Sequence, residues 1–163
     1  MKTYLSIIVL LLSVLTSPAQ NNNSAELSNI PTITFCDLIQ NPELYDGKEV
    51  RFRAKYLANS EVGAFGDRSC SSKENMTWAE FDGVSIKANS KPEIHQKVEE
   101  QILCGRCSAD NHWRETEMLV VGIFDGSDIG HGSLGKYRFM VTVKKVEEIS
   151  ETEKTRTPGF ALQ

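Results

Sequence analysis

Apolar and basic side chains alternate most clearly between residues 49 and 57. The apolar positions are Val50, Phe52, Ala54 and Tyr56, and the basic positions are Arg51, Arg53 and Lys55. A period of two with one apolar face is typical of a half-buried strand. A short helical turn at 36–39, ended by Asn41-Pro42, is expected before this strand.

Four further strands are predicted from the remaining apolar segments. We expect them at 61–65, 76–81, 118–124 and 136–146, and the apolar face of the last consists of Tyr137, Phe139, Val141 and Val143. Asp82-Gly83 is typical of a hairpin turn and should lead into a short extended segment at 84–87.

One amphipathic helix is predicted between the third and fourth strands. Ser90 and Glu93 have the spacing of a capping box, and Pro92 suits the first turn. Ile94, Val98 and Ile102 then recur on one face. Three strands, a helix and two strands is the order of the OB-fold, a five-stranded Greek-key barrel. We therefore predict an all-β domain with one packed helix in an OB-fold-like barrel, with a twisted open sheet as the alternative.

The two ends of the chain differ from this central domain. Lys2, an apolar run at 5–15 and then Ser17-Pro18-Ala19 predict a signal peptide cleaved after Ala19. The run is too short for the roughly 20 residues of a bilayer span, so no membrane span is expected after cleavage. We divide the chain into a signal peptide at 1–19, a flexible lead at 20–32, the domain at 33–149 and a flexible tail at 150–163. The expected location is secreted or periplasmic.

Charge and cysteine content narrow the partners and the chemistry. Without Lys2 the mature chain has 17 basic and 22 acidic residues, a net charge of −5 with histidine neutral. Such a chain has no general attraction for nucleic acid, and the basic face of the first strand is expected to be solvated. Four cysteines in an exported protein favour disulfides. We favour Cys36 with Cys70 and Cys104 with Cys107, and a crossed pairing of Cys70 with Cys104 or Cys107 is the alternative.

Other local motifs offer weaker candidates for chemistry. Cys104 and Cys107 have CxxC spacing, which suits a redox dithiol. With His112 and either Cys70 or Cys36 as a fourth ligand, they could instead form a zinc site. The glycine-rich loop at 126–135 is expected to be a sharp turn in which His131 is exposed. Asp125 and Asp128 lack the spacing of an EF-hand. The candidate ligand-binding residues are His131 of this loop and Arg51 and Arg53 of the basic strand face. We expect no bound metal or cofactor.

Three segments together resemble a group of secreted bacterial proteins. They are CDLI-x-NP-x-x-YDGK from Cys36, Ser69-Cys70, and GHG-x-LG-x-Y from Gly130 to Tyr137. The pattern is similar to OB-fold-like proteins of unassigned function. The resemblance implies a fold and a compartment but no catalytic residue, and it does not include Cys104 or Cys107.

These observations favour a binding or structural module of the cell envelope over an enzyme, because no complete catalytic set is present. Its partner would be an envelope protein, a glycan or a small ligand, and we expect a monomer. The alternative is a thiol or zinc protein that uses Cys104 and Cys107.

The export prediction is tested by the intact mass of protein recovered from an oxidising compartment, with and without reductant and alkylation. We expect a chain that begins at Gln20, four oxidised cysteines and no metal. Free or zinc-bound Cys104 and Cys107 would support the thiol or zinc alternative instead.

Overall fold

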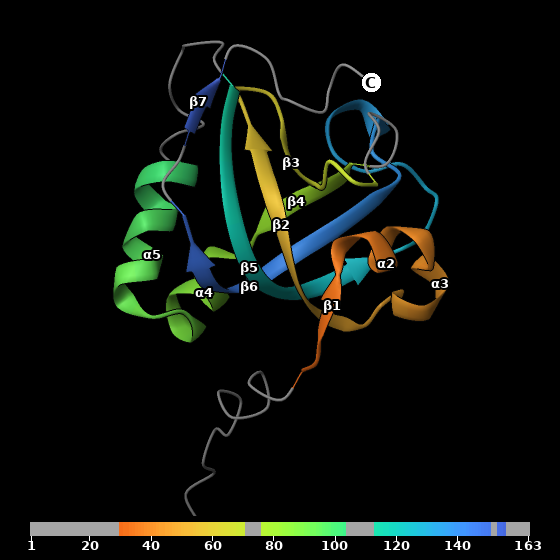
Figure 1. Cartoon of the computed structure of the whole chain (residues 1–163), viewed down its shortest axis with the longest axis horizontal. Helices are drawn as coiled ribbons and strands as arrows, with labels where there is room; N and C mark the ends of the chain where they lie inside the picture. The colour runs from red at the N-terminus through yellow and green to blue at the C-terminus, as the bar shows by residue number, and fades with distance from the viewer. Residues whose placement is uncertain (1–29, 71–75, 104–112, 151–152, 156–163) are drawn as a thin grey trace, which may run out of the picture.

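The computed structural model describes residues 30–70, 76–103, 113–150 and 153–155. Five strands form its barrel: β2 (Glu49–Ala58), β3 (Gly63–Gly66), β4 (Thr77–Phe81), β5 (Trp113–Asp125) and β6 (Phe139–Ile149). Their order around the barrel is β2-β3-β4-β6-β5, and the pairing of β5 with β2 closes it (Figure 1). Only β4 and β6 run parallel among these barrel pairs. The predicted five-stranded, OB-fold-like barrel is confirmed, and closure excludes an open sheet.

The interior of the barrel holds the side chains expected from the alternation. Val50, Phe52, Ala54 and Tyr56 are all buried, as are Phe139, Val141 and Val143. Aromatic rings form the centre: Phe52 meets Phe65 edge-on at 5.3 Å between centroids, and Tyr56 meets Phe81 at 5.2 Å. Edge-to-face pairs contribute about 0.5 to 1.5 kcal/mol beyond burial alone. The period of two therefore fixed which side of these strands faces the core.

Within the described residues, the short helices α2 and α3 precede β2 (Figure 1). α2 (Phe35–Gln40) starts where the Thr34 side chain accepts a hydrogen bond from the Asp37 amide, and it buries Phe35, Leu38 and Ile39. α3 (Pro42–Tyr45) begins at a proline, whose fixed φ suits the first turn. The predicted turn at 36–39 is confirmed, and its apolar side chains join the barrel core.

The segment after β4 is helical, so the predicted extended segment at 84–87 is wrong. Asp82 caps α4 (Gly83–Asn89), because its carboxylate accepts a hydrogen bond from the Ser85 amide at 3.1 Å. Ile86 is buried whereas Val84 is 83% exposed. Asp82-Gly83 therefore starts a helix, because the Asp82 side chain caps α4. The same two residues often form a hairpin turn in other proteins, and the sequence reading assumed that use.

The predicted capping box at Ser90 is also wrong. Ser90 ends α4, and its hydroxyl accepts a hydrogen bond from the Val146 amide of β6 at 2.9 Å. α5 (Pro92–Val98) follows with Lys91 at its N-cap and continues into the π-helix η2 (Glu99–Leu103). Val98 and Ile102 are buried in the barrel core. The helical layer between β4 and β5 thus consists of α4 and α5 with η2 rather than one helix, on the opposite side of the barrel from α2 and α3 (Figure 1).

Two short strands extend the sheet beyond the predicted limits of the domain. β1 (Thr32–Thr34) runs parallel to β2, and β7 (Glu153–Thr155) pairs antiparallel with the start of β5. Regular pairing therefore begins before residue 33 and continues after residue 149. The expected signal peptide and Cys104, Cys107 and His112 lie outside the described residues.

A second apolar cluster lies apart from the main barrel core. It contains Leu57, Ala64, Met76, Trp78 and Tyr137. The glycine-rich loop packs here, with a short 3-10 turn, η4 (Ser133–Gly135), and a bridge between His131 and Tyr137. Gly132 has φ 66° and ψ −157°, a region open almost only to glycine. A Cβ at this position would lie 2.5 Å from the Trp78 ring, so the turn depends on glycine for both conformation and space.

We predict that Gly132→Ala lowers the free energy of unfolding by about 2 to 4 kcal/mol, because strain and overlap with Trp78 add together. Urea denaturation measures this loss. Gly83→Ala is the control, since a Cβ at Gly83 meets no atom within 4 Å and α4 favours alanine. Equal stability of the two variants would contradict this account of the loop.

Candidate ligand-binding site

A groove of about 460 Å³ lies beside β2 on the surface of the described residues. We call it the β2 groove. Its volume falls within the range of about 300 to 1,000 Å³ that small-molecule sites occupy. It is lined by Thr32, Ile33, Thr34, Phe35, Arg53, Ala54, Lys55, Asp67, Arg68 and Glu117.

The groove exists because two strands share one edge of β2. β1 pairs with the first part of that edge, up to Thr34 opposite Arg53. β3 pairs with the second part, from Gly66 opposite Lys55. Both strands end here, and the chain then turns into α2 on one side and into the 67–70 turn on the other. The gap between these two departures is the groove, with Ala54 between the two pairing segments.

A disulfide joins the two walls. Cys36, two residues after Thr34, is bonded to Cys70 in the opposite turn, with Cα atoms 5.6 Å apart. This is the pairing favoured from the sequence. It spans a sequence separation of 34 residues, and chain entropy alone assigns a loop of that size about 3 to 4 kcal/mol of stabilisation. The walls of the β2 groove are therefore covalently held at a fixed spacing.

Hydrogen bonds from Ser69 order the 67–70 turn further. The Asp67 carboxylate accepts one from the Ser69 hydroxyl at 2.6 Å and one from the Ser69 amide at 2.8 Å. These bonds hold the pKa of Asp67 below its usual range, which outweighs the opposing effect of partial burial. Asp67 is therefore a fixed anion at neutral pH.

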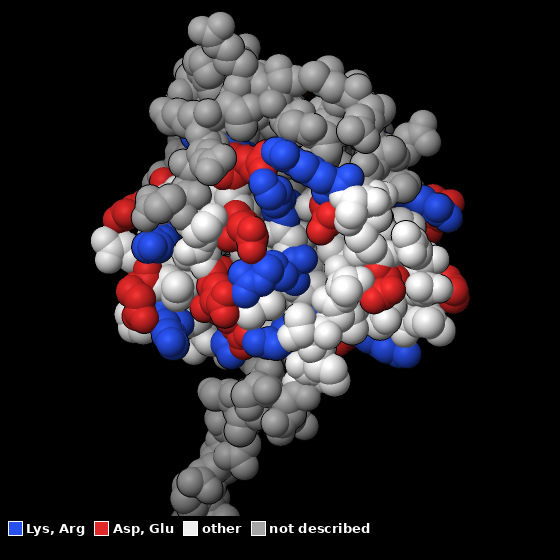
Figure 2. Space-filling view, viewed as in Figure 1, with Lys and Arg blue, Asp and Glu red and all other residues white. Residues whose placement is uncertain are grey.

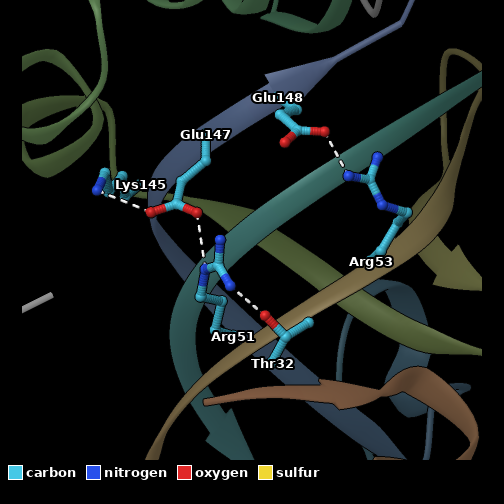
Figure 3. Close-up of polar contacts among 6 residues, drawn as sticks. All are labelled: Thr32, Arg51, Arg53, Lys145, Glu147 and Glu148. Carbon is cyan, nitrogen blue, oxygen red and sulfur yellow. Dashed lines mark hydrogen bonds and ion pairs between the residues drawn. The ribbon is translucent and has the colours of Figure 1, made fainter. Parts of the chain in front are cut away.

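The basic stripe of β2 is covered by acidic side chains from neighbouring strands. Arg51 donates to Glu147 at 2.7 Å and also to Thr32. Arg53 donates to Glu148 (Figure 3) and, at 3.3 Å, to Glu117. Figure 2 shows the result, a face on which acidic and basic side chains intermix. The stripe is thus an ion-pair network rather than a simple solvated face, and it offers no continuous basic track for a phosphate backbone.

The third cation of the stripe neutralises a buried acid. Glu115 is 5% exposed and pairs with Lys55, while Arg68 lies 3.6 Å away from the same carboxylate. An unpaired carboxylate at this depth would be strongly unfavourable. Lys55 therefore serves mainly to neutralise Glu115, and Arg68 contacts it only loosely.

The candidate residues chosen from the sequence do not converge on one site. Arg53 lines the β2 groove, whereas Arg51 and His131 do not. His131 is 7% exposed, so its predicted exposure is wrong. Its Nε2 atom lies 3.2 Å from the Ser127 carbonyl and 3.7 Å from the Asp125 carboxylate. His131 therefore stabilises the loop from within.

The described residues give limited support to a metal site. Within them, one group of potential ligands lies close together: Cys36, Asp67 and Cys70. Its two sulfur atoms are bonded to each other, so neither cysteine can be the fourth zinc ligand considered from the sequence. Asp125 and Asp128 instead contact Ser127 and Arg138, respectively.

A smaller hollow of about 260 Å³ lies beside α3 and the start of β2, lined mainly by apolar residues such as Ile30, Pro31 and Leu44. It shares only Ile33 with the β2 groove.

No helix in the described parts of the chain has the length and hydropathy needed to cross a bilayer.

Sequence reasoning missed the groove, and in particular Thr32 and Arg68. Arg68 stands two residues before Cys70, so the favoured Cys36–Cys70 pairing would have placed it near the start of α2. The pairing of both β1 and β3 with one edge of β2 had no counterpart in the apolar pattern.

Comparison with protein-family models, curated proteins and solved structures finds no match to this chain.

One ion pair of the network should make stability depend on pH. Partial burial acts to raise the pKa of Glu147, but hydrogen bonds from Lys145 and Arg51 outweigh it and bring the pKa below its ordinary value of 4.5. A lowered folded-state pKa stabilises the protein above the unfolded-state pKa, and the stabilisation disappears as the pH falls through the folded-state value.

We predict that Glu147→Gln lowers the free energy of unfolding by about 1 kcal/mol at pH 7 and by less at pH 3. Urea denaturation across this range gives the difference from wild type at each pH. Glu80→Gln, at an exposed glutamate of β4, is the control and should show little effect at either pH. A Glu147→Gln effect that does not shrink on acidification would show that the carboxylate charge is not responsible.

Proposed function

We propose that this protein is an exported, non-catalytic binding module of the cell envelope, and that the β2 groove is its ligand site. The observation that carries the proposal is a groove of small-molecule size whose two walls are linked by the Cys36–Cys70 disulfide. A preorganised site loses less entropy when its ligand binds. The signal peptide expected at 1–19 and the use of a disulfide both fit an oxidising compartment.

The charged groups of the groove favour binding over acid–base catalysis. A general acid or base works best when its pKa lies near the working pH. Asp67 departs from that requirement because Ser69 lowers its pKa. Glu117 is hydrogen-bonded to Arg53, and Lys55 is paired with Glu115. These groups therefore act as fixed charges that position a ligand.

Thiol or zinc chemistry at Cys104 and Cys107 remains the alternative. It rests on residues outside the described structure, and the geometry of the β2 groove adds nothing to it. The groove therefore gives the binding proposal the stronger physical basis.

The proposal predicts that the groove binds an uncharged apolar probe, N-phenyl-1-naphthylamine, whose fluorescence rises in apolar surroundings. Thr32→Trp should weaken this binding roughly tenfold or more, about 1.4 kcal/mol, because the indole occupies the groove. Thr32 is exposed at the rim and lines the β2 groove but not the smaller hollow beside α3. Fluorescence titration of the full mature protein gives both affinities.

Thr142→Trp is the control, since Thr142 lies on β6 away from the groove lining. Its affinity for the probe should equal that of wild type. Binding that persists unchanged in Thr32→Trp would place the site elsewhere, for example in the hollow beside α3. That result, or no saturable binding at all, would contradict the proposed function.

A further inference from the structure

We infer that the ligand of the β2 groove is an amphipathic anion, a small molecule with an apolar body and one anionic oxygen group that Arg68 binds. This inference rests on the proposed function and specifies the ligand class. The anionic group is a carboxylate, sulfonate or phosphate, since all three present oxygen acceptors that match a guanidinium.

Apolar side chains provide one part of the groove. Ile33, Phe35 and Ala54 lie among its lining residues. Phe35 and Ala54 are 1% and 4% exposed and form the packed floor, so Ile33 is the most exposed of the three. A ligand body placed here removes its own apolar surface and that of Ile33 from water, at about 25 cal/mol for each Å² buried. This part of the groove favours an aliphatic or aromatic group.

Arg68 is the cation of the groove whose donors are most available. Arg53 is hydrogen-bonded to Glu117 and Glu148, and Lys55 is paired with Glu115. Within the described chain the partner of Arg68 is Glu115 at 3.6 Å, longer than a normal hydrogen bond. The Arg68 side chain is 60% exposed. A guanidinium has five N–H donors, so Arg68 can still make a two-pronged contact with an anion.

The charges around the groove single out the same cation. Three basic residues and two acidic residues line the groove. Glu115 and Glu148 do not line it but pair with Lys55 and Arg53, respectively, and so balance these two cations. Arg68 is therefore the lining cation that an anionic ligand complements.

The disulfide sets the position of Arg68 relative to the apolar part. Arg68 lies two residues before Cys70, and Cys70 is bonded to Cys36 at the start of α2, beside Phe35. The 67–70 turn is also closed by a hydrogen bond from the Cys70 amide to the Asp67 carbonyl at 3.2 Å. The anion-binding and apolar parts of the groove are therefore held at one spacing, and a ligand must carry its charge at one end of its body.

A matched pair of probes tests this inference. 8-Anilinonaphthalene-1-sulfonate has the ring system of N-phenyl-1-naphthylamine plus one sulfonate. We expect the sulfonate probe to bind the mature protein about tenfold more tightly than the uncharged probe. Arg68→Gln should remove this advantage, so that the two probes bind the variant with similar affinities. Arg138→Gln is the matched control, because Arg138 is 51% exposed and does not line the groove.

The outcomes separate this inference from the function on which it rests. Equal affinities for both probes in wild type, or an Arg68→Gln variant that keeps the sulfonate preference, would overturn the anion assignment. If Thr32→Trp still blocked the uncharged probe in that case, the groove would remain a binding site of another specificity. Insensitivity of both probes to Thr32→Trp would overturn the binding site itself.

Discussion

The division of one edge of β2 between two strands governs the rest of this structure. β5 pairs with the other edge over ten residues, from Glu49 to Ala58, and so closes the barrel. β1 and β3 each use only part of the remaining edge and end facing each other. β2 therefore has a strand on both sides over 51–53 and 55–58, and the two partner strands leave the sheet at the same point. The barrel and the groove are therefore consequences of the same pairing.

The two faces of β2 have different physical roles. The inward face packs Phe52 and Tyr56 into an aromatic core, and this burial is the main source of stability. The outward face carries Arg51, Arg53 and Lys55, which meet glutamates contributed by β5 and β6. The pairs of Arg53 are exposed and contribute little to stability, whereas Arg51 and Lys55 pair with largely buried glutamates. Together these pairs occupy Arg53 and Lys55, so that Arg68 is the cation left with available donors.

The Cys36–Cys70 disulfide holds together the two segments that leave the sheet after β1 and β3. Where two strands diverge from a shared edge, the regular hydrogen bonds of the sheet no longer hold their departing segments together. The Cys36–Cys70 disulfide connects those segments beyond the last paired residues, and the bonds from Ser69 to Asp67 fix the turn on one side. A shallow groove in an 18.2 kDa protein is thereby given defined walls.

Apolar periodicity in the sequence predicted which residues of β2 and β6 face the core and the order of the five barrel strands along the chain, because this periodicity is a property of neighbouring residues. The sequence reading was wrong at 84–87, because Asp82 caps a helix there instead of starting a hairpin turn. It was also wrong at Ser90, which ends α4 instead of capping the next helix. Only the folded chain shows that His131 is buried, that glutamates cover the basic stripe, and that Arg68 lines the same groove as Phe35 and Arg53. These facts depend on pairings between residues far apart in the chain, such as Arg53 with Glu148 and Cys36 with Cys70, and no local pattern encodes the register that brings them together.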